Sequence, residues 1–179
     1  FKEILENVFC HTCTYGITAL EGGTSLTLIN CWASLCDSGY LIDKTIYSTL
    51  INCACDNCNF GYRIRECGSM SIINCGVENS ADMPFLLENC HEVTVTGLAS
   101  VNGNTNKTDS VGTVLSIRDC TNIIANNCEE INAPLDDTYS VIIIRSSRVS
   151  IYNNSIRTIN TDGTISNDND LVLSQIQTT

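Results

Sequence analysis

Three copies of one short segment decide the fold: LTLINC at residues 26–31, TLINC at 49–53 and SIINC at 71–75. The steps from Asn30 to Asn52 and from Asn52 to Asn74 are both 22 residues. A second segment recurs with the same step, because CDSGY at 36–40 returns as CNFGY at 58–62. A fixed period of this length indicates a repeat architecture in which each unit stacks on the next.

Later units keep the pattern with a looser period. A third segment has four versions: IREC at 64–67, LENC at 87–90, IRDC at 117–120 and IRSS at 144–147. The units contain two short aliphatic stretches, several with the alternation typical of strands, and nowhere a capped helical stripe. Stacking lets strands of neighbouring units pair in parallel and bury apolar faces that one unit cannot bury alone. The sequence therefore predicts an all-β fold, a single-stranded parallel β-helix (solenoid) of about seven coils, with residues 1–179 as one domain. A leucine-rich repeat is the competing fold. The second half of each of its repeat units is usually helical, whereas the second half of each unit here has the pattern of a strand.

Charge and hydropathy exclude two classes of partner. The chain has 9 basic and 20 acidic residues, a formal net charge of −11. A protein that binds nucleic acid or an anionic membrane surface needs clustered Lys and Arg, and here the basic residues are few and scattered. No apolar run reaches the ~18 residues of a membrane-spanning helix. We therefore expect neither a nucleic-acid partner nor a membrane span.

The twelve cysteines follow the repeat. Stacking places nine of them in columns: Cys31, Cys53 and Cys75; Cys13, Cys36 and Cys58; Cys67, Cys90 and Cys120. Adjacent coils keep Cβ atoms near ~4.8 Å, longer than a disulfide prefers, which favours buried free thiols that fill space. The C-x-x-C pairs at 10–13 and 55–58 lie two coils apart, too far for one zinc ion. The sequence predicts no metal, no cofactor, and folding in a reducing compartment.

The Asn column, the alternation before it and the 22-residue coil resemble the right-handed parallel β-helix of the pectate-lyase-like superfamily. This superfamily includes pectate lyases, polygalacturonases, alginate epimerases and bacteriophage tailspikes. The resemblance implies a phage or prophage tail appendage, or tailspike, that engages a host-surface polysaccharide. Such proteins are usually homotrimers. We therefore expect a trimer that folds in a reducing cytosol and then lies in the virion tail or outside the cell. NTDG at 160–163 resembles the first polygalacturonase signature, but the later signatures are absent. Because the chain begins without Met, we expect it to be a fragment of a longer one.

Most candidate site residues lie in the two longest connecting segments, Ala99–Val111 and Glu129–Tyr139. Glycosidic bond cleavage uses paired carboxylates as acid and as base or nucleophile. The catalytic candidates are Asp136, Asp137, Glu129 and Glu130. The candidates for substrate binding are Lys107, Asp109, Tyr139, Arg118 and Arg145. An enzymatic alternative is a β-helical polysaccharide hydrolase or lyase that acts through these carboxylates, and a second alternative is a purely structural spacer.

One column of charged residues also follows the repeat and is called the charge column below. Its predicted members are Asp43, Arg65, Glu88, Arg118 and Arg145. Opposite charges on neighbouring parallel strands stabilise the register by a few tenths of a kcal/mol. The column is interpreted as a salt-bridge ladder in which an Arg is also able to contact an anionic sugar.

Overall fold

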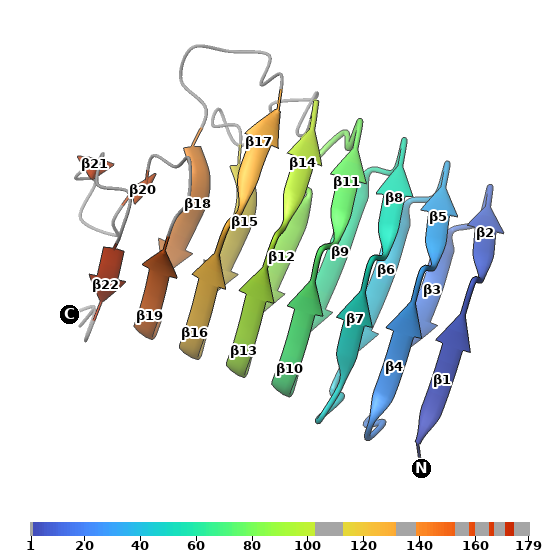
Figure 1. The fold of residues 1–179 in the computed structure, drawn as a ribbon, viewed down its shortest axis with the longest axis horizontal. Helices are drawn as coiled ribbons and strands as arrows, with labels where there is room; N and C mark the ends of the chain where they lie inside the picture. Colours follow the sequence, from blue (N-terminus) through green and yellow to red (C-terminus); the bar gives the residue numbers. More distant parts are fainter. Residues whose placement is uncertain are drawn as a thin grey trace.

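The computed structural model describes residues 2–102, 113–131 and 139–152, together with three short strands at 158–159, 165–166 and 171–173. Within these ranges the chain forms strands and no helix, which confirms the predicted all-β fold. Successive strands belong to three sheets in turn, so the chain winds once around for every three strands (Figure 1). Six coils have all three strands among the described residues, close to the predicted number of about seven.

Three sheets form the long faces of the solenoid. Sheet A contains β1 (Glu3–Glu6), β4 (Leu26–Ile29), β7 (Thr49–Ile51), β10 (Gly68–Ile73), β13 (His91–Thr96), β16 (Thr121–Asn126), β19 (Ser147–Tyr152) and β22 (Leu171–Leu173). Sheet B contains β2 (Phe9–His11), β5 (Trp32–Ser34), β8 (Ala54–Asp56), β11 (Gly76–Glu78), β14 (Ala99–Val101) and β17 (Glu129–Ile131). Sheet C contains β3 (Tyr15–Ala19), β6 (Ser38–Asp43), β9 (Phe60–Arg65), β12 (Phe85–Glu88), β15 (Thr113–Arg118), β18 (Tyr139–Ile144), β20 (Thr158–Ile159) and β21 (Ile165–Ser166).

Strands that neighbour each other in a sheet pair in parallel, except β22 with β19 and β21 with β20. The predicted repeat is the observed register: Leu28 lies opposite Leu50, which lies opposite Ile72, and Tyr40 lies opposite Tyr62. The described part of the chain has no helix long and apolar enough to cross a membrane.

The chain turns between sheets through residues in the left-handed backbone conformation. After sheet A these residues are Asn7, Asn30, Asn52, Asn74, Gly97 and Asn127, with φ between 50° and 66°. Asn tolerates this conformation better than other residues with a side chain, which explains the Asn column. Side-chain amides of this column also pair with each other, since Asn52 Nδ2 donates to Asn30 Oδ1 at 3.4 Å.

All twelve cysteines are free thiols, and ten of them are buried. Each column forms as predicted; Cys10 and Cys55 also share a position, with Ala33 between them. The thiols are more than filler, because corner cysteines donate S–H to the carbonyl two residues earlier, as Cys67 does to Arg65 at 3.1 Å and Cys120 does to Arg118 at 3.0 Å. Burial raises the pKa of Cys128 to about 11 and also raises the pKa of Cys55, so these thiols keep their proton at neutral pH.

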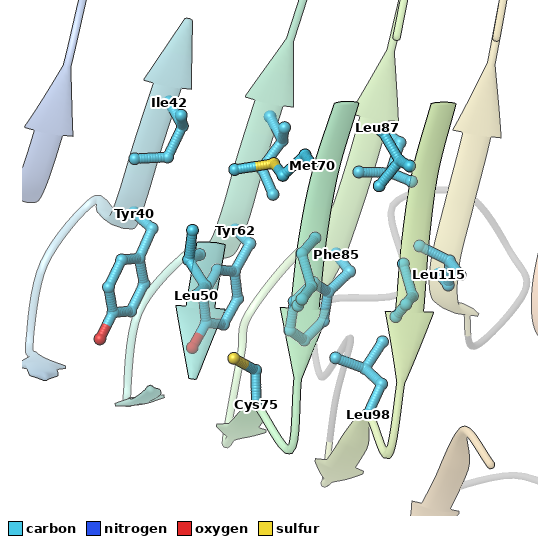
Figure 2. Packing of buried hydrophobic residues seen from close by; sticks show 14 of the residues in the cluster. Tyr40, Ile42, Leu50, Tyr62, Met70, Cys75, Phe85, Leu87, Leu98 and Leu115 are labelled. Carbon is cyan, nitrogen blue, oxygen red and sulfur yellow. The ribbon is translucent and has the colours of Figure 1, made fainter. Parts of the chain in front are cut away.

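An aromatic stack fills the centre of the solenoid. The ring centroids of Tyr40 and Tyr62 are 4.3 Å apart, and those of Tyr62 and Phe85 are 4.1 Å apart, with nearly parallel planes (Figure 2). Tyr40 donates its hydroxyl to the carbonyl of Cys31 at 2.7 Å. All three rings are fully buried, and aliphatic residues such as Leu50 pack around them.

One predicted register is wrong by one residue. Asp43, Arg65, Glu88 and Arg118 do lie opposite one another in turn on sheet C. The residue opposite Arg118 is Ile144, and Arg145 lies beyond the strand at the next corner. The reason is packing: buried Ile143, not Ile144, lies opposite buried Ile117, and Ser146 takes the place that Cys120 has one coil earlier.

Candidate functional site

A shallow groove runs across the outer face of sheet B, over the strands from β5 to β14. It has a volume of about 160 Å³. We call it the sheet B groove. It is lined by Trp32, Ala54, Cys55, Gly76, Val77, Glu78, Ala99 and Val101. In Figure 1 its strands lie side by side in the upper row that ends at β17.

The groove arises from the alternation of three-residue strands. The middle residue of each strand points into the core, as buried Ala33, Cys55 and Val77 show, so the first and third residues face outward. The first residues form one outward column, called the floor column: Phe9, Trp32, Ala54, Gly76, Ala99 and Glu129. The hollow lies over three small residues that follow one another in this column: Ala54, Gly76 and Ala99.

Trp32 closes one end of the hollow. Its side chain is 44% exposed, and Phe9 on the next strand is 64% exposed and stacks on His11 with ring centroids 5.8 Å apart. Exposed aromatic rings on a flat sheet offer a surface against which the apolar face of a ligand ring packs. The floor column thus begins with an aromatic platform.

Carboxylates border the groove. The third residues of the strands lie in register and form a second column, the rim column: His11, Ser34, Asp56, Glu78 and Val101. Asp56 lies directly opposite Glu78, so two carboxylates stand on adjacent strands. Glu129 is exposed at the far end of the floor column, four strands from Trp32, a span of roughly 19 Å.

Amide side chains hold the rim in place. Asn79 Nδ2 donates to Asp56 Oδ1 at 3.1 Å, and Asn102 Nδ2 donates to Asn79 Oδ1 at 3.1 Å. Asn57, Asn79 and Asn102 all have a left-handed backbone, which turns the chain from sheet B toward sheet C. The ordered rim is suited to hydroxyl or amine groups of a ligand, because a carboxylate accepts hydrogen bonds and an amide both donates and accepts them.

A larger hollow of about 590 Å³ opens at the first coil, between β1 and the turn from Ala19 to Thr24. Its wall is mostly backbone and aliphatic side chains, and it contains two carboxylates, Glu3 and Glu21, but no aromatic ring. The smaller sheet B groove combines a ring, small floor residues and a polar rim, so it is the better candidate site.

The structure places the predicted site residues on two faces. Glu129 begins β17 in the floor column, and Glu130 follows it opposite Ser100. Tyr139 begins β18 opposite Thr113, on sheet C. Asp136, Asp137, Lys107 and Asp109 lie outside the described residues. Of the predicted residues, Glu129 alone is placed in line with the groove.

The two predicted arginines lie on the sheet C side. Arg118 is half-buried at the end of β15, and its Nε donates to Ser116 Oγ at 3.0 Å. Arg145 at the following corner makes two hydrogen bonds to Asp119, at 2.6 and 2.5 Å. That pairing lowers the pKa of the Asp119 carboxyl, because Arg145 donates to its charged form. Neither arginine shares a sheet with Glu129.

Sequence reasoning missed the most distinctive groove residues. Trp32, Asp56 and Glu78 lie outside the recurring segments that revealed the repeat, and none of them was a predicted site residue. A signal was present, since Trp32 directly follows the inward Cys31 column at the same 22-residue step as Ala54 and Gly76. Three-residue strands are too short for alternation to be recognised in a single unit.

No group of three His, Cys, Asp or Glu side chains close enough to hold a metal ion occurs in the part of the chain that the structure describes. Sequence comparison finds no matching family model and no matching curated protein. Among solved structures, the chain is similar in fold to a proposed glycosyl hydrolase from Parabacteroides merdae, with a TM-score of 0.55 and 13% identity. The match covers 98% of this chain and 85% of that one. At this identity the likeness shows the fold alone: the chain is a parallel β-solenoid.

Proposed function

We propose that this protein engages a polysaccharide and that the sugar chain lies in the sheet B groove. The observation that carries the proposal is the floor column, in which exposed Trp32, three small residues and exposed Glu129 follow one another along the solenoid axis. Sugar rings present apolar C–H faces that pack on an indole, and hydroxyl groups that bind carboxylates and amides. A linear surface of roughly 19 Å from Trp32 to Glu129 suits a polymer better than a single small molecule.

The fold supports this function by analogy. The similar solved structure is of a proposed glycosyl hydrolase, a protein class that acts on carbohydrate. We further propose that the solenoid is of the pectate-lyase-like type. Fold alone does not determine function, so the proposal depends on the groove residues.

Within that class we propose a phage or prophage tail appendage that engages a host-surface glycan, assembled as a homotrimer. Twelve free thiols, ten of them buried, support folding in a reducing cytosol before the protein reaches the virion tail or the outside of the cell. Buried thiols that donate to corner carbonyls are compatible with folding where disulfides do not form.

Polysaccharide hydrolysis is the second candidate, and one observation favours it. Asp56 and Glu78 lie directly opposite each other on adjacent strands, where Cβ atoms are roughly 5 Å apart. Paired carboxyl groups at about 5–5.5 Å act in retaining glycosidases, and wider pairs act in inverting ones. Asp136, Asp137 and Glu130 remain predicted catalytic residues alongside Glu129.

Trp32→Ala tests the proposed function. A panel of neutral, acidic and amine-bearing oligosaccharides is titrated into the unmodified chain by calorimetry, and the solutions are then assayed for new reducing ends. We expect at least one glycan to bind and Trp32→Ala to weaken it by about tenfold or more, because an aromatic anchor contributes on the order of 1–3 kcal/mol. Tyr47→Ala is the matched control, since Tyr47 is an aromatic residue 66% exposed outside sheet B.

Two results would contradict the proposal. One is the absence of binding to every glycan of the panel. The other is an equal affinity of Trp32→Ala and Tyr47→Ala, which would place any bound sugar away from the groove. New reducing ends that depend on Glu78 would establish hydrolysis in addition to binding.

A further inference from the structure

Sheet B differs from the other two sheets in its charge. Its six strands contain no Lys or Arg. Their outward positions contain three acidic residues, Asp56, Glu78 and Glu129, while Glu130 takes the middle position of β17. His11 is the one residue of these strands with a basic side chain, and its ring stacks on Phe9. Among the described residues, the face that carries the groove therefore has acidic side chains on three of its six strands and no Lys or Arg.

Basic side chains of the described residues are held elsewhere. The Arg63 guanidinium lies 4.5 Å from the centre of the Phe60 ring, and Arg65 Nε lies 3.7 Å from Asp43 Oδ1, both on sheet C. Arg145 pairs with Asp119, and Lys44 Nζ lies 4.0 Å from Glu66 Oε2, both at corners after sheet C. These partners keep the cations on another face than the groove.

We propose that the sheet B groove selects a polysaccharide whose sugars carry protonated amines, such as a polymer of glucosamine, over polymers of uronic acids. This inference rests on the proposed function, because it names the sugar class that the same groove takes. The predicted contact between an Arg of the charge column and an anionic sugar would lie on sheet C, on another face than this groove.

The rim column contains the two carboxylates that would bind a protonated amine of the sugar. Asp56 and Glu78 lie opposite each other, and like charges in that position destabilise a sheet unless a cation lies near them. An ammonium group between the two carboxylates removes the repulsion and gains charge-assisted hydrogen bonds. Asn79 fixes the Asp56 carboxylate at one end of this contact. Glu78 is exposed toward the groove that it lines.

The aromatic platform is compatible with the same ligand. A cation over the face of a Trp ring is attracted by the negative charge of the ring face, which favours an ammonium-bearing sugar beside Trp32. A uronate would meet repulsion from Asp56, Glu78 and Glu129, and from the net charge of −11. A neutral sugar would gain the ring contact and the hydrogen bonds of its hydroxyl groups, but no attraction between opposite charges.

The test compares three hexamers of matched length on the unmodified chain at pH 5.5 and low salt: glucosamine, N-acetylglucosamine and galacturonate. Calorimetry should give about tenfold tighter binding of the glucosamine hexamer than of its acetylated counterpart, the scale of one hydrogen-bonded charge. The galacturonate hexamer should bind most weakly. The preference for glucosamine should shrink as salt is added, since screening acts on charges near the surface.

Glu78→Gln should reduce the preference for glucosamine to about threefold or less, while N-acetylglucosamine binding changes little, because one of two carboxylates at the contact loses its charge. Glu92→Gln is the control. Glu92 is an exposed carboxylate on sheet A that accepts a hydrogen bond from Ser69 at 2.7 Å, so its loss should leave all three affinities unchanged.

The outcomes separate this inference from the function on which it rests. Equal binding of the amine and acetylated hexamers, or tighter binding of galacturonate, would overturn the inference and leave a polysaccharide-binding groove. Loss of preference in Glu92→Gln as well as in Glu78→Gln would show a general charge effect and would also overturn it. Binding of none of the three hexamers, nor of any other glycan, would overturn the proposed function itself.

Discussion

Two columns of sheet B are adjacent in sequence but opposite in environment. The inward column contains Ala33, Cys55, Val77 and Ser100, all of which are buried. The floor column beside it changes from the large ring of Trp32 to three consecutive small residues and then to Glu129. Inward side chains must fill the space between coils, so their sizes are constrained at each step. Outward side chains have no such constraint, and their order is free to fit a ligand.

The largest expected effect is a break of the inward aromatic stack. Phe85→Ala should destabilise the protein by about 3–5 kcal/mol, because it removes a buried ring that stacks on Tyr62 and leaves a cavity. Chemical denaturation followed by circular dichroism measures the change. Leu35→Ala is the outward counterpart: Leu35 is 51% exposed, and its loss should change stability by no more than about 0.5 kcal/mol. Equal costs for both variants would contradict the distinction between the two environments.

Replacing one glycine in the core and one in the floor column by alanine compares the same two environments, because each substitution adds a single Cβ atom. A Cβ on Gly61 would collide with the carbonyl oxygen of Pro84 and lie 2.6 Å from Val77 Cγ2 in the core. A Cβ on Gly76, in the floor column, would meet the Ala99 carbonyl oxygen at 3.7 Å, an ordinary contact. We expect Gly61→Ala to cost about 1–3 kcal/mol through overpacking and Gly76→Ala to cost less than about 0.5 kcal/mol.

Thermal unfolding of the two glycine variants should therefore separate them clearly, with a lower midpoint for Gly61→Ala. A Gly76→Ala variant as unstable as Gly61→Ala would show that the floor column is packed and not open. That result would also remove the hollow on which the sheet B groove depends.

The inward columns were predictable from the sequence because packing repeats them. Stacked coils place the same side chain at the same depth, so Cys and aliphatic residues recur at nearly constant steps and reveal the register. Asn recurs with them because the turn after sheet A needs a left-handed backbone. The prediction failed for Arg145, where similarity of an Ile-Arg pair suggested one alignment and burial of Ile143 selected another. A comparison of short sequence segments gives exposed and buried residues the same weight, whereas the buried residues determine the register of the strands.

The candidate site was less predictable for the same reason. A groove forms where outward residues differ from one coil to the next. Such differences do not recur at a fixed step, so a search for repeats does not find them. Trp32, Asp56 and Glu78 lie in three-residue strands whose single inward residue gives too little alternation to assign a face. Glu129 was predicted from its charge in a connecting segment, while its position in line with Trp32 depends on pairing across four strands.

The smallest effect concerns an exposed pair at a corner after sheet C. Asp119→Asn should cost less than about 1 kcal/mol at pH 7, because the pair with Arg145 is largely exposed to solvent and salt. The hydrogen bonds from Arg145 lower the pKa of Asp119 in the folded state. A lowered carboxyl pKa contributes stability at pH values above the unfolded pKa of about 3.9, and this contribution is lost as pH falls through the lower folded pKa.

Denaturation of Asp119→Asn and the unmodified protein between pH 7 and about pH 2.5 should show a small difference that decreases toward the acid end, as the Asp119 carboxyl takes up a proton. The difference at pH 7 should also decrease in 1 M salt. A difference that stays constant over this pH range would contradict the assignment of the effect to the ion pair. Asp119 has a left-handed backbone, at φ 52°. Asn adopts that conformation as readily as Asp, so the substitution isolates the ion pair from the backbone.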